Sequence, residues 1–157
     1  MMTVAFKTFG CRLNHAETAQ YEAEFAAAGF RRVPLGTPSH VIVVHSCAVT
    51  QKAESEGLKL LRALRASWPE ACLVLVGCAV ESRDAADLPA DLVVHRDQKN
   101  ALVSLVQQRL GLEPQAVVAP VTYAPSFHRS ALKIQDGCDF FCAYCIVPHT
   151  RGQPVSR

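Results

Sequence analysis

Val41-Ile-Val-Val44 and Leu73-Val-Leu-Val76 are the two stretches of sequence that decide the fold. Each is a continuous run of apolar residues, without the alternation of a strand that has one face in water. Such runs are typical of parallel strands that are buried on both faces of a sheet. Two further candidate strands, Thr3–Phe9 and Leu92–Val94, bring the predicted set to four.

Helical patterns separate these strands along the chain. Apolar residues recur there at intervals of three or four, the spacing of a helix that packs one face on a core. The predicted helices cover His15–Ala28, Gln51–Trp68, Glu81–Asp87 and the stretch from Asp97 to Leu110. Regular alternation of strands and helices implies an α/β fold, an open parallel sheet flanked by helices.

Two of the helix starts carry candidate caps. Asn14 is placed to cap the first long helix, and Glu17, three residues later, can complete a capping box. Asp97 can cap the last helix in the same way. We therefore interpret Glu17 as a cap and not as an acid–base group. The histidines without a fixed-spacing partner are interpreted as surface or packing residues: His15, His40, His45, His95 and His149.

The sequence divides into three segments. Residues 1–111 contain all of these patterns and can bury a core of their own. Residues 112–129 contain several prolines and no helical period, so we interpret them as a semi-extended linker. In residues 130–157 a further predicted strand, Ala131–Ile134, runs into a cysteine-rich loop.

Composition and charge narrow the class of protein. Of 157 residues 50% are apolar and 19% are charged, which suits a globular domain, and the net charge of +2 gives no sign of a basic nucleic-acid-binding surface. No stretch approaches the roughly 20 apolar residues of a membrane span, and the start lacks the design of a secretory signal. We expect a cytoplasmic, monomeric protein without a membrane partner.

Seven cysteines are unexpected in a reducing compartment, where metal binding or redox chemistry explains them better than disulfides do. Cys11, Cys47 and Cys78 each follow the carboxyl end of a predicted strand, the edge at which open α/β sheets assemble ligand sites. If these strands are neighbours, the three thiols gather at one rim. The alternative is that each is a small buried apolar residue, which is how we interpret Cys72.

Three further cysteines lie in one compact C-x₃-C-x₂-C loop. Cys138, Cys142 and Cys145 can hold three corners of a cubane iron–sulfur cluster, which leaves the fourth iron without a protein ligand. Structural zinc prefers four ligands, and His149 is the nearby candidate for a fourth. The aromatic residues of the loop either shield a cluster or pack as ordinary side chains, and Tyr144 could contact a cofactor base.

Two stretches resemble a known family. The loop Gly137–Gly152, with the sequence GCDFFCAYCIVPHTRG, is similar to the cluster loop of radical S-adenosylmethionine (SAM) enzymes, specifically the methylthiotransferases. Residues 6–18, FKTFGCRLNHAET, resemble the opening of that family's N-terminal domain. Together with residues 132–138, they look most like the branch that adds a methylthio group to C2 of N6-threonylcarbamoyladenosine beside the tRNA anticodon. Sister branches act on isopentenyladenosine in tRNA or on an aspartate of a ribosomal protein.

The resemblance implies two [4Fe–4S] clusters and SAM as cofactors, and tRNA as substrate. Cys138, Cys142 and Cys145 would hold the cluster whose open iron binds SAM, and Tyr144 would contact the SAM adenine. The resemblance leaves the donors of sulfur and of electrons open.

By the same resemblance, Cys11, Cys47 and Cys78 would hold the second cluster. Members of the family continue past the position of Arg157 through a partial α/β barrel and a small RNA-binding domain. We therefore expect this chain to be a fragment that has no activity alone, with residues 130–157 as the start of a truncated radical SAM domain. The alternative from another class is a stand-alone iron–sulfur or electron-transfer module.

Overall fold

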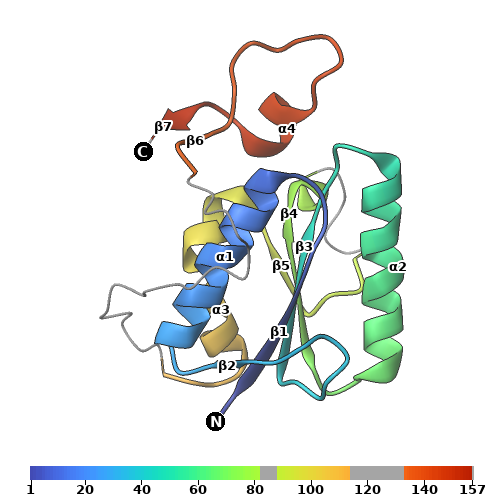
Figure 1. The fold of residues 1–157 in the computed structure, drawn as a ribbon, viewed down its shortest axis with the longest axis vertical. Helices are drawn as coiled ribbons and strands as arrows, with labels where there is room; N and C mark the ends of the chain where they lie inside the picture. Colours follow the sequence, from blue (N-terminus) through green and yellow to red (C-terminus); the bar gives the residue numbers. More distant parts are fainter. Residues whose placement is uncertain (82–87, 114–132, 157) are drawn as a thin grey trace.

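The computed structural model describes residues 1–81, 88–113 and 133–156. Its main feature is a five-stranded sheet with the order β2-β1-β3-β4-β5, in which every pair of neighbours is parallel (Figure 1). The expected α/β fold with an open parallel sheet is thus confirmed. The strands are β1 (Thr3–Thr8), β2 (Arg31–Arg32), β3 (Val41–Ser46), β4 (Cys72–Gly77) and β5 (Leu92–Val94).

The two apolar runs form the centre of this sheet. Strands β3 and β4 are buried over their whole length, and they pair in a register that sets Ser46 opposite Gly77. Strand β1 lies on the other side of β3, with Thr8 opposite His45. The carboxyl ends of β1, β3 and β4 therefore meet at one edge of the sheet. Strand β2 was not predicted, because two exposed arginines carry no apolar pattern.

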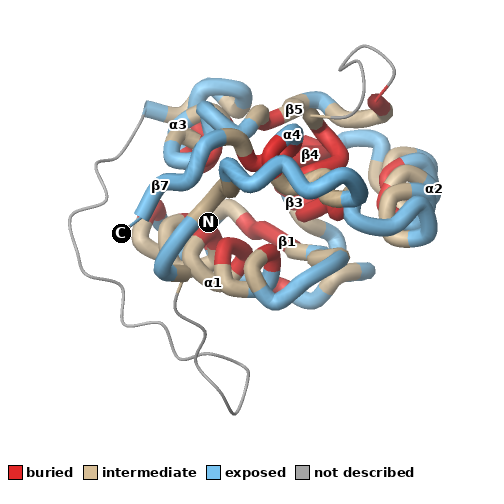
Figure 2. Tube along the Cα trace, turned by 90° about the horizontal axis from the view of Figure 1, so that it is seen from above, coloured by how far each residue is buried: buried red, intermediate tan, exposed pale blue. Residues whose placement is uncertain are grey.

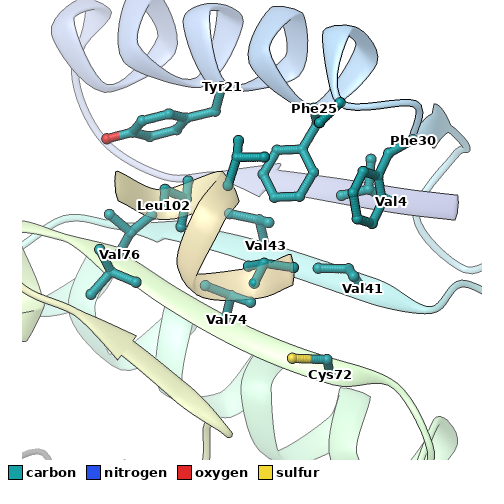
Figure 3. Close-up of a cluster of buried hydrophobic side chains, with 14 residues drawn as sticks. Val4, Tyr21, Phe25, Phe30, Val41, Val43, Cys72, Val74, Val76 and Leu102 are labelled. Atoms are coloured by element: carbon teal, nitrogen blue, oxygen red, sulfur yellow. The ribbon is translucent and has the colours of Figure 1, made fainter. Parts of the chain in front are cut away.

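Helices cover both faces of the sheet (Figure 1). On one face lie α1 (Arg12–Ala27) and α3 (Leu102–Arg109), and on the other lies α2 (Gln51–Ser67). The first face buries the apolar cluster of Figure 3, in which the Phe25 ring meets Phe30 edge-on at a centroid distance of 5.1 Å. Cys72 lies in this cluster, and burial raises the pKa of its thiol.

The predicted helix caps are wrong in detail. Helix α1 begins at Arg12, with Cys11 in the N-cap position and no side chain capping it, so Asn14 lies inside the helix. Glu17 is buried and makes ion pairs that are described below. The last helix begins as a 3₁₀ helix, η3 (Arg96–Ala101), and α3 continues from it. The N-cap of η3 is His95 and not Asp97, since Asp97 already lies in its first turn.

The carboxyl-terminal segment lies across the edge where the central strands end (Figure 1). Its elements are β6 (Gln135–Asp136), α4 (Val147–Arg151) and β7 (Val155–Ser156), and β6 pairs antiparallel with β7. The predicted strand Ala131–Ile134 is displaced, because Lys133 and Ile134 are not in a strand and β6 starts at Gln135. Residues 131 and 132 lie outside the described residues, as do most of the predicted linker 112–129 and of the predicted helix Glu81–Asp87.

Among the described residues, no helix combines the length and the apolar character that crossing a membrane requires.

Candidate functional site

Three cysteines follow three neighbouring strands of the sheet. Cys11 comes three residues after Thr8, the last residue of β1, while Cys47 and Cys78 directly follow β3 and β4. All three line one cavity of about 290 Å³ at the carboxyl edge of the sheet. Cys47 and Cys78 are buried, and Cys11 is exposed. The structure therefore places the three thiols in the wall of a single cavity.

Glycines let the strand ends approach one another closely. Gly10 has φ +98°, and a β-carbon added there would lie 2.6 Å from both Cβ and Sγ of Cys47. Gly77 has φ +109°, and a β-carbon there would overlap the carbonyl oxygen of Ser46. Contacts this short leave no room for a side chain. Glycine directly before Cys11 and Cys78 is thus required by the packing of the rim.

The donor set of this cavity suits a thiolate-bound metal centre. None of the three cysteines is in a disulfide, and soft thiolate ligands select iron–sulfur clusters, zinc or copper(I). The backbone N–H of Val49 donates a hydrogen bond to Sγ of Cys47 over 3.4 Å, the type of contact that tunes cluster sulfurs. In the described part of the chain, no three His, Cys, Asp or Glu side chains are drawn together closely enough to hold a metal ion. Their role as ligands stays a prediction.

The second cysteine set lies in the loop between β6 and α4. Cys138 and Cys145 are half-buried, Cys142 is exposed, and the N–H of Cys145 donates to the carbonyl of Cys142 over 2.9 Å. None of the three lines the cavity of the first set, although Gly137 and residues of α4 do. The two sets therefore lie close together without sharing one pocket.

The aromatic residues of this loop mostly face outward. Tyr144 is 93% exposed and Phe140 is 83% exposed, so ordinary packing within the described residues does not account for them. Phe141 has φ +46°, an uncommon conformation for a residue with a side chain, and its ring meets His149 edge-on at 5.8 Å. His149 thus contacts an aromatic ring of the loop. Contact of Tyr144 with SAM remains a prediction.

A buried ion cluster joins the carboxyl-terminal segment, residues 133–156, to the part of the chain that forms the five-stranded sheet (the sheet domain). At its centre is the carboxylate of Glu17, whose side chain is 3% exposed. Lys133 Nζ lies 2.6 Å from Oε1, Arg151 Nη2 lies 3.2 Å from Oε2, and both residues belong to the carboxyl-terminal segment. From the sheet domain, Lys99 Nζ and His45 Nε2 each lie 3.4 Å from this carboxylate.

Arg151 contacts three partners at once: Glu17, Asp136 and Asn14. Its guanidinium donates to Asp136 Oδ1 and to Asn14 Oδ1, each over 2.7 Å, besides its contacts with Glu17. Asn14 in turn donates from Nδ2 to the carbonyls of Phe9 and Ser46, each over 2.9 Å. Arg151, at the end of α4, thereby connects β6 to α1 and, through Asn14, to the ends of β1 and β3.

These contacts set the charge states of the cluster. Burial disfavours the Glu17 carboxylate, but the contact with His45 and the positive charges of Lys99, Arg151 and Lys133 hold its pKa far below its ordinary value. Burial likewise disfavours the Arg151 guanidinium, and Glu17 and Cys78 nevertheless raise its pKa. Burial lowers the pKa of His45, which favours the neutral ring.

The ion cluster could not be predicted from the sequence, in which Glu17 has the spacing of a helix cap. A signal for the burial of Glu17 was present: the buried residues of α1 include Glu17, Tyr21 and Phe25, which follow one another at intervals of four. A carboxylate on the apolar stripe of a helix requires a buried partner. The sequence could not indicate that the partners would be Lys133 and Arg151, more than 100 residues away.

Comparison with known proteins agrees with this architecture. A family model described as "Uncharacterized protein family UPF0004" matches residues 3–96, which include the whole five-stranded sheet. The chain belongs to this family. The match covers the strands that precede Cys11, Cys47 and Cys78, and it ends before the second cysteine set.

Curated relatives match nearly all of the chain. A Thermotoga maritima protein named threonylcarbamoyladenosine tRNA methylthiotransferase MtaB is 32% identical to this chain over 99% of the chain's length. A Bacillus subtilis protein of the same name is 30% identical over 100% of the chain. A Bartonella bacilliformis protein named tRNA-2-methylthio-N(6)-dimethylallyladenosine synthase is 26% identical over 98%. The chain spans 38%, 38% and 39% of the length of these three relatives.

Proposed function

We propose that this chain is the cluster-binding part of a tRNA methylthiotransferase, and that the nucleoside modified is N6-threonylcarbamoyladenosine. The observation that carries the proposal is the convergence of three free thiols on one cavity, at the ends of adjacent parallel strands. The names of the relatives support the enzyme class. Matched relatives named for threonylcarbamoyladenosine are 27–32% identical and those named for dimethylallyladenosine are 26–28% identical, so the highest identities favour the first nucleoside.

In this proposal the first cysteine set, Cys11, Cys47 and Cys78, holds one [4Fe–4S] cluster in the 290 Å³ cavity. Two of these thiols, those of Cys47 and Cys78, are buried and the third, that of Cys11, is exposed, so the sheet rim shields part of the site from water. Gly10 and Gly77 allow the backbone to approach the thiols, and the N–H of Val49 supplies a hydrogen bond to Cys47. With three ligands from the chain, a cluster held here would leave one position open for a sulfur ligand.

The second set, Cys138, Cys142 and Cys145, holds the other cluster. When it is bound with SAM, it supplies the one-electron chemistry that breaks an unactivated C–H bond. Cys142 and Tyr144 are both exposed, so this side of the loop is accessible to a cofactor. Tyr144 is the residue proposed to contact the SAM adenine.

Anaerobic reconstitution with iron and sulfide tests the cluster assignment. The wild-type chain is expected to bind about eight irons, four for each cubane. Replacing either cysteine set by alanine is expected to remove about half of them, whereas Cys72→Ala provides the matched control and retains all. Fewer than about two irons in the wild type, or zinc without sulfide, overturns the assignment.

The substrate is tested with the full-length protein that contains this chain. Expression in a host that lacks its own methylthiotransferases, followed by mass spectrometry of tRNA nucleosides, is expected to show a methylthio group on N6-threonylcarbamoyladenosine. The same group on isopentenyladenosine would reassign the branch. An iron–sulfur protein that cycles reversibly, with no change in its spectrum on addition of SAM, would instead indicate an electron-transfer module.

A further inference from the structure

Two neighbouring cavities share a wall. The cavity of the first cysteine set borders a second, charged cavity of about 420 Å³, and the residues that line both are Gln135 and Arg151. Gln135 is exposed, whereas the side chain of Arg151 is 4% exposed. Seen from above in Figure 2, α4, whose last residue is Arg151, lies over the end of the buried central strands. Arg151 is thus the buried part of the shared wall.

The contacts of Arg151 join parts of the chain that are far apart in the sequence. On one side it binds Asp136, which lies just before the second cysteine set. On the other side it binds Glu17 and Asn14, and Asn14 holds the carbonyl of Ser46 next to Cys47. A planar guanidinium with five donors can serve several acceptors at fixed angles, which a lysine cannot do.

The backbone around Arg151 also fixes the loop. The N–H of Cys138 donates to the carbonyl of Gly152 over 3.0 Å, and the N–H of Gly152 donates to the carbonyl of Pro148 over 3.1 Å. A β-carbon added at Gly137 would lie 2.6 Å from the carbonyl oxygen of Gly152. The start of the cysteine loop therefore packs directly on the residue that follows Arg151.

We propose that Arg151 is a positioning residue, which fixes the loop of Cys138–Cys145 against the rim of Cys11, Cys47 and Cys78. In this role it sets the distance and orientation between the two metal sites. The inference rests on the proposed function for the identity of those sites, but the mechanical connection is a property of the chain itself. Lys133, which binds both Glu17 and Asp136, is a second and more exposed link of the same kind.

Hydrogen exchange on the reduced, metal-free 157-residue chain tests the connection. In Arg151→Met, the backbone amides of Cys138 and Gly152 are expected to exchange at least about tenfold faster, because removing one partner leaves Glu17 in a buried site with fewer counter-charges. The amides of β3 and β4 are expected to be unchanged. The control is Arg65→Met, which removes a guanidinium paired with Asp91 far from the loop. It is expected to leave the loop amides as in the wild type.

Arg151→Lys is a second, more conservative variant that tests the same inference if Arg151→Met does not fold. It keeps a positive charge beside Glu17 but cannot reach Asn14 and Asp136 at the same time, so faster exchange at the loop amides is again expected. Wild-type exchange rates in Arg151→Lys, or in a folded Arg151→Met, overturn the inference. Faster exchange that spreads equally over β3 and β4 also overturns it, since it would indicate a general contribution to stability.

A second readout separates positioning from ligand binding. In reconstituted Arg151→Lys, iron content is expected to equal that of the wild type, while the magnetic coupling between the two reduced clusters changes in the electron paramagnetic resonance spectrum. Unchanged coupling overturns the inference. The two proposals can fail separately. If the wild-type chain binds no iron but the Arg151 variants show faster exchange at the loop amides, only the cluster assignment is refuted. If the wild-type chain binds iron but the Arg151 variants exchange as the wild type does, only the role of Arg151 is refuted.

Discussion

Gly77→Ala tests whether the close approach of strand ends is needed for the fold. Gly77 has φ +109° and ψ −171°, a region that residues with a side chain avoid at a cost of about 1–3 kcal/mol. The added methyl group would also overlap the carbonyl oxygen of Ser46 and lie 2.6 Å from Cδ2 of His45. Because Ser46 and Gly77 are paired in the sheet, the backbone of β3 or β4 must move, which costs about 1–3 kcal/mol more.

The expected loss for Gly77→Ala is therefore about 4 kcal/mol of the free energy of unfolding, out of about 5–15 kcal/mol for a typical domain. Gly29→Ala is the matched control, since Gly29 also has a positive φ, +82°, but an added β-carbon would meet nothing within 4 Å. It should cost roughly 1–2 kcal/mol. Urea unfolding of the reduced chain, followed by the fluorescence of the single tryptophan, Trp68, measures both. Equal losses in the two variants would refute the reasoning.

Three further predictions concern the rim and the ion cluster. Gly10→Ala should displace Cys47 and lower the iron retained on reconstitution by about half relative to Gly29→Ala, so full retention would contradict the packing described. Cys72→Ala should retain all iron and cost about 1 kcal/mol in urea unfolding, whereas loss of iron would make Cys72 a ligand. Glu17→Gln should cost about 3 kcal/mol at pH 7. Because the pKa of Glu17 is lowered in the folded state, this cost is full above its ordinary value of 4.5 and shrinks as the pH falls below it; a cost that is larger at pH 3.5 than at pH 7 would contradict the assignment.

The parallel sheet could be predicted because its information is local. The runs that become β3 and β4 are apolar at every position, and that pattern has few other interpretations at such a length. The positions of Cys11, Cys47 and Cys78 followed from the same information, since parallel strands end at a common edge. Whether these three cysteines bind a metal depends on the chemistry of their thiols. Neither the apolar pattern of the strands nor the course of the backbone determines it.

Helix starts and the carboxyl-terminal segment were predicted less well, because their signals compete. Asn14 and Glu17 have the spacing of a capping box, yet Asn14 binds two strand-end carbonyls and Glu17 pairs with distant cations. Helix capping and these tertiary contacts would satisfy the same polar side-chain atoms, and the available tertiary partners determine which of the two forms. The start of β6 at Gln135 is set by its pairing with β7, which is equally invisible in a local pattern.

The charges of the ion cluster bear on why it lies beside the thiol cavity. Two carboxylates face three cations, so the cluster carries one surplus positive charge when His45 is neutral: Glu17 and Asp136 against Lys99, Lys133 and Arg151. A surplus charge in a buried place is costly unless an anion lies close to it. Arg151 lines the cysteine cavity together with Cys11, Cys47 and Cys78, so thiolates in that cavity would lie beside its guanidinium. Metal binding requires deprotonated thiols, so if the three cysteines bind a metal centre as proposed, the guanidinium proposed to position the loop would also compensate part of the negative charge of these ligands.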